Sequence, residues 1–317
     1  MGPRHAWLVV LATIASIPLV AVNAQAQAWP LPEGTGSVSI IYHHVFVRDH
    51  LFAGGEPRDI GHIRSHVVTA DVEYGISDRV SVRALLPYVA AKYRGSQGHG
   101  SPSSPDFHFI DDGAYHSGFQ DVRAEVRYNG REFPVAITPF VAVGVPTHDY
   151  EFFAHSAIGL KMAELQIGSY LGGFVGRRVS VQGRVSYGIY ERVAGHRRNR
   201  VNVDAEFTWT AGQRVQLFVF EAAQISHGGV ELVYEELPIY RQQYWWPHHD
   251  RLGQAHFLNI GAGLALNVTP SLAVQASIAR TVQGSNTHAA SYGIAVGSTW
   301  GFSASARHRQ HPAAPAQ

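Results

Sequence analysis

Residues 67–88 read VVTADVEYGISDRVSVRALLPY, and this stretch decides the fold. Apolar side chains take every second place on both sides of a polar triplet, from Val68 to Ile76 before it and from Val80 to Tyr88 after it. Because successive side chains of a strand point to opposite faces, this period predicts two strands joined as a hairpin. Each run has about ten residues, roughly the length that a tilted strand needs to cross a bilayer.

The same period recurs along the chain and predicts twelve strands. Tight connections such as 77–79 alternate with mostly longer ones such as 94–117 and 227–255. Every second connection then lies on the same side, which favours an all-β fold: an antiparallel up-and-down transmembrane β-barrel of about 12 strands, with short periplasmic turns and long outer loops. A secreted β-sandwich is the alternative, but a Greek-key sandwich would mix the loop lengths. The strands are expected near 37–47, 63–76, 80–93, 118–129, 133–145, 161–175, 179–191, 200–210, 214–226, 256–267, 271–282 and 288–302.

The start of the chain predicts a secretory signal peptide over residues 1–26. Arg4 precedes an apolar stretch over 6–22, and Ala24 and Ala26 offer the small residues of a cleavage site. An uncleaved membrane anchor is the alternative. Residues 27–303 are expected to form the barrel, and 304–317 a disordered tail. The secreted barrel is therefore expected in a bacterial outer membrane.

The composition agrees with a membrane barrel. Cysteine is absent, and only 15% of the residues are charged, below the roughly 25% of ordinary soluble domains. The formal net charge of +1 gives no reason to expect a nucleic-acid partner. The expected partners are outer-membrane lipid and lipopolysaccharide, a small-molecule solute and the barrel-assembly machinery. The oligomeric state stays open.

Three blocks of sequence resemble a known family. They are YGISDRVSV at 74–82 with Leu86, Pro87 and Tyr88 after it, GFQDV at 118–122, and PFVAVGVPT at 139–147. They are similar to blocks of an outer-membrane transporter family that is named for the meta-cleavage pathway of phenol degradation. The resemblance implies a barrel, and an uptake channel for small, often aromatic compounds. The chain departs from that family's pattern in its histidine-rich loops.

The polar faces of the predicted strands carry charges that are expected inside the barrel. They could line the lumen and select solutes, or fill a narrow barrel with salt bridges. These residues are Asp71, Glu73, Arg83, Asp121, Arg123, Glu125, Arg127, Arg184, Asp204 and Glu206.

Histidine is the second signal, with 19 residues in the chain. In the predicted topology the histidines of the barrel lie in outer loops or in the outer halves of strands. They predict a divalent metal site or a pH-sensitive gate at the outer mouth, since neutral imidazole binds zinc, copper or nickel. A polar rim without metal is the alternative. The candidate ligands are His108, Asp111, Asp112 and His116 in one loop, and His248, His249 and Asp250 in another.

Four aromatic residues share the longest predicted outer loop: Tyr240, Tyr244, Trp245 and Trp246. They could fold inward as an outer-loop gate, or pack the loop against the rim.

These patterns together predict a channel or facilitator for small molecules, including aromatic or hydrophobic ones, rather than an enzyme. No cofactor is expected other than the metal. One alternative is a surface receptor or metal-binding protein whose barrel is an anchor. A less favoured one is a lipid-modifying enzyme, because the adjacent pairs His116–Ser117 and His155–Ser156 would face opposite ways in a strand.

Overall fold

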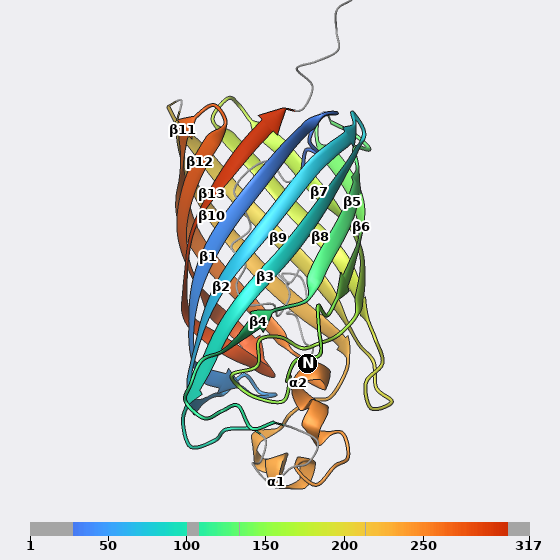
Figure 1. The fold of residues 1–317 in the computed structure, drawn as a ribbon, viewed down its shortest axis with the longest axis vertical. Helices are drawn as coiled ribbons and strands as arrows, with labels where there is room; N and C mark the ends of the chain where they lie inside the picture. Colours follow the sequence, from blue (N-terminus) through green and yellow to red (C-terminus); the bar gives the residue numbers. More distant parts are fainter. Residues whose placement is uncertain (1–27, 100–107, 133, 213, 304–317) are drawn as a thin grey trace, which may run out of the picture.

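The computed structural model describes residues 28–99, 108–132, 134–212 and 214–303. Their strands form one antiparallel sheet that closes into a barrel, because β1 pairs with both β2 and β13 (Figure 1). The strands are β1 (Thr35–Leu51), β2 (Pro57–Ser77), β3 (Val80–Arg94), β4 (His116–Phe119), β5 (Val122–Tyr128), β6 (Ala136–Val145), β7 (Glu164–Val175), β8 (Val179–Tyr190), β9 (Arg198–Ala211), β10 (Val215–Gly228), β11 (His256–Thr269), β12 (Leu272–Ser285) and β13 (Thr287–Ser303).

The strands β4 and β5 are two pieces of one predicted strand. Counted as one, they give the barrel wall the twelve strands that the sequence predicts. Both pieces pair with β3, and the pairing shifts by one residue between Leu85↔Arg123 and Tyr88↔Phe119. The break lies opposite Pro87, which has no N–H to donate to the ladder. Its carbonyl still accepts a hydrogen bond from the Gln120 N–H at 2.9 Å.

The hairpin 67–88 confirms the predicted alternation between the two faces of the wall. Val68, Val72 and Ile76 point outward and are exposed. Asp71 points inward and is only 6% exposed. An apolar exterior around a polar interior reverses the order of a soluble domain and suits a barrel surrounded by lipid. Among the described residues, no helix is long and apolar enough to span a membrane.

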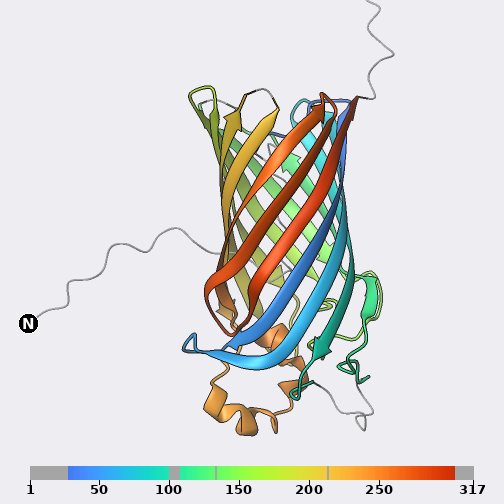
Figure 2. The same cartoon turned by 90° about the vertical axis from the view of Figure 1, so that its left-hand side faces the viewer.

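The two ends of the barrel differ (Figures 1 and 2). Short turns close one end, whereas long connections fold over the other. The connection between β10 and β11 carries four short helices, η1 (Tyr234–Glu236), α1 (Leu237–Tyr240), η2 (Trp246–His248) and α2 (His249–Leu252). We call the folded connections at this end, over residues 52–56, 95–99, 108–115, 146–163, 191–197 and 229–255, the outer cap.

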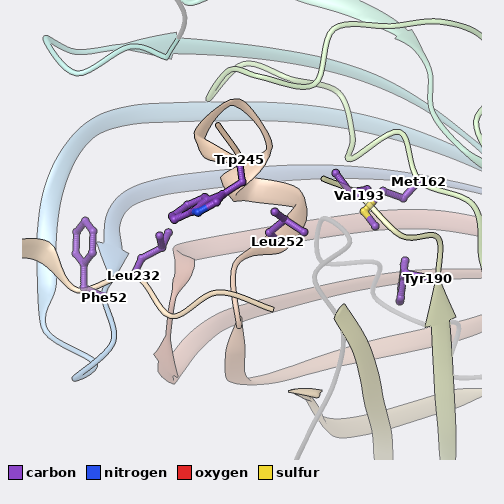
Figure 3. Packing of buried hydrophobic residues seen from close by; sticks show 7 residues of the cluster. All are labelled: Phe52, Met162, Tyr190, Val193, Leu232, Trp245 and Leu252. Atoms are coloured by element: carbon purple, nitrogen blue, oxygen red, sulfur yellow. The ribbon is translucent and has the colours of Figure 1, made fainter. Parts of the chain in front are cut away.

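The outer cap has an apolar core of its own (Figure 3). Side chains from four connections and from the end of a strand meet in it, so the connections pack as one unit. The buried members are Phe52, Met162, Tyr190, Val193, Leu232, Trp245 and Leu252.

Residues 28–34 precede β1 and occupy the lumen near the short-turn end. Ala28 is fully buried, and its carbonyl accepts a 2.7 Å hydrogen bond from the Thr138 hydroxyl. Gly172 leaves room for this segment, since a Cβ there would lie 2.5 Å from the Cβ of Ala28. The predicted signal peptide, residues 1–26, and the predicted tail, residues 304–317, lie outside the described residues.

Candidate functional site

A cavity of about 260 Å³ lies in the outer half of the lumen, directly beneath the outer cap. Its apolar walls come largely from strands at the outer end, including Val45, Val47, Ile63 and Val89. Cap residues make its outer boundary, and almost half of the lining is polar, including Arg198, Asp250, Asn259 and four histidines. The cavity can therefore hold a small molecule that has both apolar and polar groups.

Below this cavity, paired charges project from the barrel wall into the lumen. Arg83 donates to Asp71 with its Nε 2.8 Å from Oδ1. The Arg127 Nε lies 2.6 Å from Glu125 Oε1, and its Nη1 lies 3.1 Å from Glu73 Oε2. Each of these carboxylates thus faces a guanidinium, and the charges compensate one another within the barrel.

The other predicted lumen charges also have partners. Arg123 pairs with Glu125 at 2.8 Å, and Arg184 pairs with Asp204 at 2.5 Å. Gln182 donates to Glu206 at 2.9 Å. Asp121 lies at the junction of β4 and β5 and accepts a 2.5 Å hydrogen bond from the Tyr150 hydroxyl of the cap. All ten residues therefore lie where the alternation places them, while their role in selectivity remains a prediction.

Five histidines gather where the cap meets the cavity. The ring of His99 lies 3.9 Å from that of His155 and 4.7 Å from that of His249, measured between centroids. The ring of His288 lies 5.3 Å from that of His155 and 4.9 Å from that of His50. Only His249 belongs to the metal ligands predicted from the sequence. The five residues come from five segments at unrelated spacings, so local patterns could not find the cluster.

Burial lowers the pKa of two of these imidazoles, His99 and His155, and so favours their neutral form. It lowers the pKa of His99 well below its ordinary value, and the neighbouring histidines lower it further. It lowers the pKa of His155 to about 4, although the Asp111 carboxylate and the Gln97 carbonyl oppose the shift. Neutral imidazoles carry a lone pair on one ring nitrogen, and this is the form that binds metals.

The predicted metal ligands separate in the structure. The His108 side chain is 96% exposed. His116 pairs with Asp112, with 2.9 Å between Nε2 and Oδ1, at the cap surface. The His248 ring stacks on Phe152, with centroids 5.4 Å apart. These three histidines do not converge.

Asp111, another of the predicted ligands, stabilises the cap through hydrogen bonds to the backbone. Its carboxylate accepts hydrogen bonds from the backbone N–H groups of His99 at 2.7 Å, His155 at 3.1 Å and Ser156 at 2.9 Å. It therefore ties two cap connections together. His249 and Asp250 do meet, and they meet with His99.

Three of the four aromatic residues predicted as a gate pack within the cap. Trp245 is buried in the cap core, with Tyr240 at 5.6 Å between ring centroids. Trp246 lies flat on His249 at 4.0 Å. Tyr244 is 73% exposed and faces away from the core. The packing of these rings agrees with the second interpretation, and movement as a gate remains a prediction.

The serines beside histidines are not arranged for acyl transfer. The Ser156 hydroxyl lies 2.7 Å from Asp111 Oδ1 and 2.7 Å from the Ile110 carbonyl oxygen, while His155 Nε2 faces the Gln97 carbonyl at 3.1 Å. The Ser117 hydroxyl lies 2.9 Å from that of Tyr88. Neither serine contacts its neighbouring histidine through a hydrogen bond in the part of the chain that the structure describes.

Comparison with known proteins identifies the fold. No family model matches the sequence, and no curated protein matches it. The structure is similar to that of an outer-membrane channel from Pseudomonas putida F1, with a TM-score of 0.65 and 14% identity over 87% of this chain and 98% of that one. It also matches the NanC porin, with a TM-score of 0.46 and 9% identity over 83% and 98% of the two chains. A mutant of the monoaromatic hydrocarbon channel TodX matches with a TM-score of 0.44 and 8% identity over 86% and 91%. The first similarity, together with the apolar exterior, establishes the fold of an outer-membrane β-barrel.

Proposed function

We propose that this barrel is an outer-membrane channel for small, weakly polar molecules, with single-ring aromatic compounds as the best-fitting class. The cavity beneath the outer cap carries this proposal. A cavity of roughly 150 Å³ is enough to bind benzene, and this one has about 260 Å³ with walls that are part apolar and part polar. The apolar part would hold the ring, and the polar groups would orient a hydroxyl or amide substituent.

The arrangement of the lumen suggests how such a solute would pass. The outer cap covers the cavity on one side, and the charge pairs and residues 28–34 lie between the cavity and the other end. Passage therefore requires the cap to open and the lower lumen to rearrange. Because the cap, the charge pairs and residues 28–34 occupy much of the lumen, this arrangement argues against a wide, permanently open pore for hydrophilic solutes.

Two further observations support a channel for aromatic solutes. The solved structure with a TM-score of 0.65 is that of an outer-membrane channel. The blocks at 74–82, 118–122 and 139–147 resemble a family associated with aromatic compounds. The assignment to that named family is part of the proposal.

Flux into proteoliposomes tests the proposal. Purified protein is reconstituted, and the uptake of benzamide and of a disaccharide is measured against protein-free liposomes. We expect benzamide flux above the protein-free background and little flux of the disaccharide. Uptake of neither solute, together with no conductance in planar bilayers under any applied voltage, would exclude a channel.

A surface metal-binding barrel is a second candidate, because five histidines converge at the outer mouth. The two functions are compatible, since a metal bound there would lie in the cap above the cavity.

A further inference from the structure

We infer that His99, His249 and Asp250 form a binding site for one divalent transition-metal ion, which joins two connections of the outer cap. His99 lies in the connection between β3 and β4, whereas His249 and Asp250 lie on α2 in the connection between β10 and β11. A bound ion would therefore cross-link the two longest outer connections. Of these three ligands, the sequence predicts His249 and Asp250 but not His99, because His99 lies far from them in the chain.

The spacing of the three side chains fits a single ion. One ligand atom from each residue lies within 4.8 Å of the others. Asp250 Oδ2 is 3.6 Å from His99 Nδ1, and Asp250 Oδ1 is 3.5 Å from His249 Nε2. Ligands bound tetrahedrally at about 2.0–2.1 Å are separated from one another by roughly 3.3 Å. Small side-chain movements would thus complete the coordination.

The His249 ring is already set in the orientation that a metal requires. Its Nδ1 lies 2.8 Å from the Trp246 carbonyl oxygen, so Nδ1 carries the proton and Nε2 carries the lone pair. Such a hydrogen bond from the other ring nitrogen typically orients metal-binding histidines. The Trp246 ring stacks on the imidazole at an interplanar angle of 5° and fixes its plane.

The His99 ring is also fixed in orientation, in its case by stacking between two aromatic rings. It lies between Phe153, at 5.5 Å, and His155, at 3.9 Å, and is nearly parallel to Phe153. Its Nδ1 and the Oδ2 of Asp250 are both buried, and neither has a hydrogen-bond partner among the described residues. The 3.6 Å between them is too long for a direct hydrogen bond. A buried polar atom without a partner is costly, and an ion between them would satisfy both.

The nature of the ligands indicates the class of metal. Two imidazoles and one carboxylate suit Zn²⁺, Ni²⁺ or Cu²⁺ rather than Ca²⁺ or Mg²⁺, which prefer oxygen ligands. Three protein ligands leave one position of a tetrahedral ion free for water. Asp111 is not available, because its carboxylate already accepts backbone hydrogen bonds.

Isothermal titration calorimetry of the full-length, EDTA-treated barrel with Zn²⁺ and with Mg²⁺ tests the site. We expect one Zn²⁺ per chain and no Mg²⁺ binding. His99→Ala and Asp250→Asn should each weaken Zn²⁺ binding at least tenfold. The matched control is His108→Ala with His116→Ala, which removes an exposed cap histidine and a partly exposed one at the start of β4 and should leave the affinity unchanged. The isosteric Asp250→Asn keeps the test valid if His99→Ala disturbs the cap.

The spectrum of bound Co²⁺ gives an independent readout. A tetrahedral site with two nitrogen ligands should give visible absorption in the parent that is lost in the Asp250→Asn variant. Absence of Zn²⁺ binding by the parent would overturn the inference. So would an equal loss of affinity in the His108→Ala/His116→Ala control.

The effect on transport rests on the proposed channel function. If the ion holds the cap closed, saturating Zn²⁺ should lower benzamide flux several-fold in the parent and leave it unchanged in Asp250→Asn. Zn²⁺ binding without any change in flux would contradict this closing role but not the site. Zn²⁺ binding in a barrel that shows no flux under any condition would contradict the channel and leave the site established.

Discussion

Side chains obstruct both the outer and the lower half of the lumen, but through different interactions. In the lower half, ion pairs such as Arg127 with Glu125 and Glu73 project from the wall into the lumen, and residues 28–34 lie beside them. At the outer end, neutral histidines and aromatic rings pack beneath an apolar cap core. The outer half should therefore respond to protons and metal ions under mild conditions, whereas the lower half should not.

The largest expected effect on stability comes from removing an ion pair in the lower half of the lumen. Arg127→Met removes the guanidinium that faces Glu73 and Glu125; Glu125 keeps Arg123, but the largely buried Glu73 carboxylate loses its ion partner, which costs up to about 3–5 kcal/mol. Thermal unfolding of the barrel in detergent, followed by gel mobility, should show a clear decrease in Tm. Arg79→Met, in an exposed turn, is the control. A Tm equal to that of the control would mean that the charge pairs do not stabilise the barrel.

The next largest effect is expected from a substitution that weakens the apolar packing of the outer cap. Leu252→Ala deletes a fully buried side chain of the cap core, and such changes cost about 2–5 kcal/mol. The loss should be local, so the cap connections should become more sensitive to limited proteolysis while the Tm of the barrel stays nearly constant. Tyr244→Ala, at an exposed position, should have no such effect. A protected cap in Leu252→Ala would show that its apolar core does not hold it closed.

Acid should loosen the outer half selectively. Burial holds the pKa of His155 at about 4 in the folded cap, against an ordinary value of 6.5. Because the open cap binds the proton more readily, this stabilisation is complete above about pH 6.5 and is lost as the pH falls toward 4. The full loss is roughly 3 kcal/mol.

Hydrogen exchange of the cap backbone, measured in the presence of EDTA, follows this transition. Exchange should accelerate between pH 6.5 and 4 after correction for the intrinsic rate, while the strands stay protected. The carboxylates of Asp111 and Asp250 face the imidazoles. Their negative charge would stabilise protonated histidines in the folded cap and so reduce the loss of stability. Equal protection of the cap at pH 7 and pH 4 would contradict the comparison.

The smallest expected effect concerns residues 28–34. Thr138→Val removes the hydroxyl that donates to the Ala28 carbonyl, which leaves a buried acceptor unpaired at a cost of about 1–3 kcal/mol. A cysteine introduced at Trp29 should then react faster with a thiol reagent. Thr138→Ser restores the donor and should restore the slow rate. Equal rates in Thr138→Val and the parent would mean that this hydrogen bond does not retain the segment.

The strands and the segments that connect or precede them differ in how well the sequence predicts them. The strands and all ten lumen charges follow from a period of two residues, which is fixed by backbone geometry and needs no tertiary information. The position of residues 28–34 and the meeting of His99 with His249 depend on how connections fold, and no local period records that. His108 and His116 look like ligands in the sequence because they lie close to aspartates, yet in the structure His108 faces solvent and His116 pairs with Asp112 alone.

Solute passage through the cavity beneath the cap is the central claim, and a matched pair of tryptophan variants tests it most directly. Val45→Trp fills the cavity from an inward-facing position of β1, whereas Ile40→Trp adds the same ring on the outer face of the same strand. Benzamide flux into proteoliposomes should fall at least tenfold in Val45→Trp and stay at the parent's rate in Ile40→Trp. Undiminished flux in a folded Val45→Trp barrel would show that the solute does not pass through this cavity.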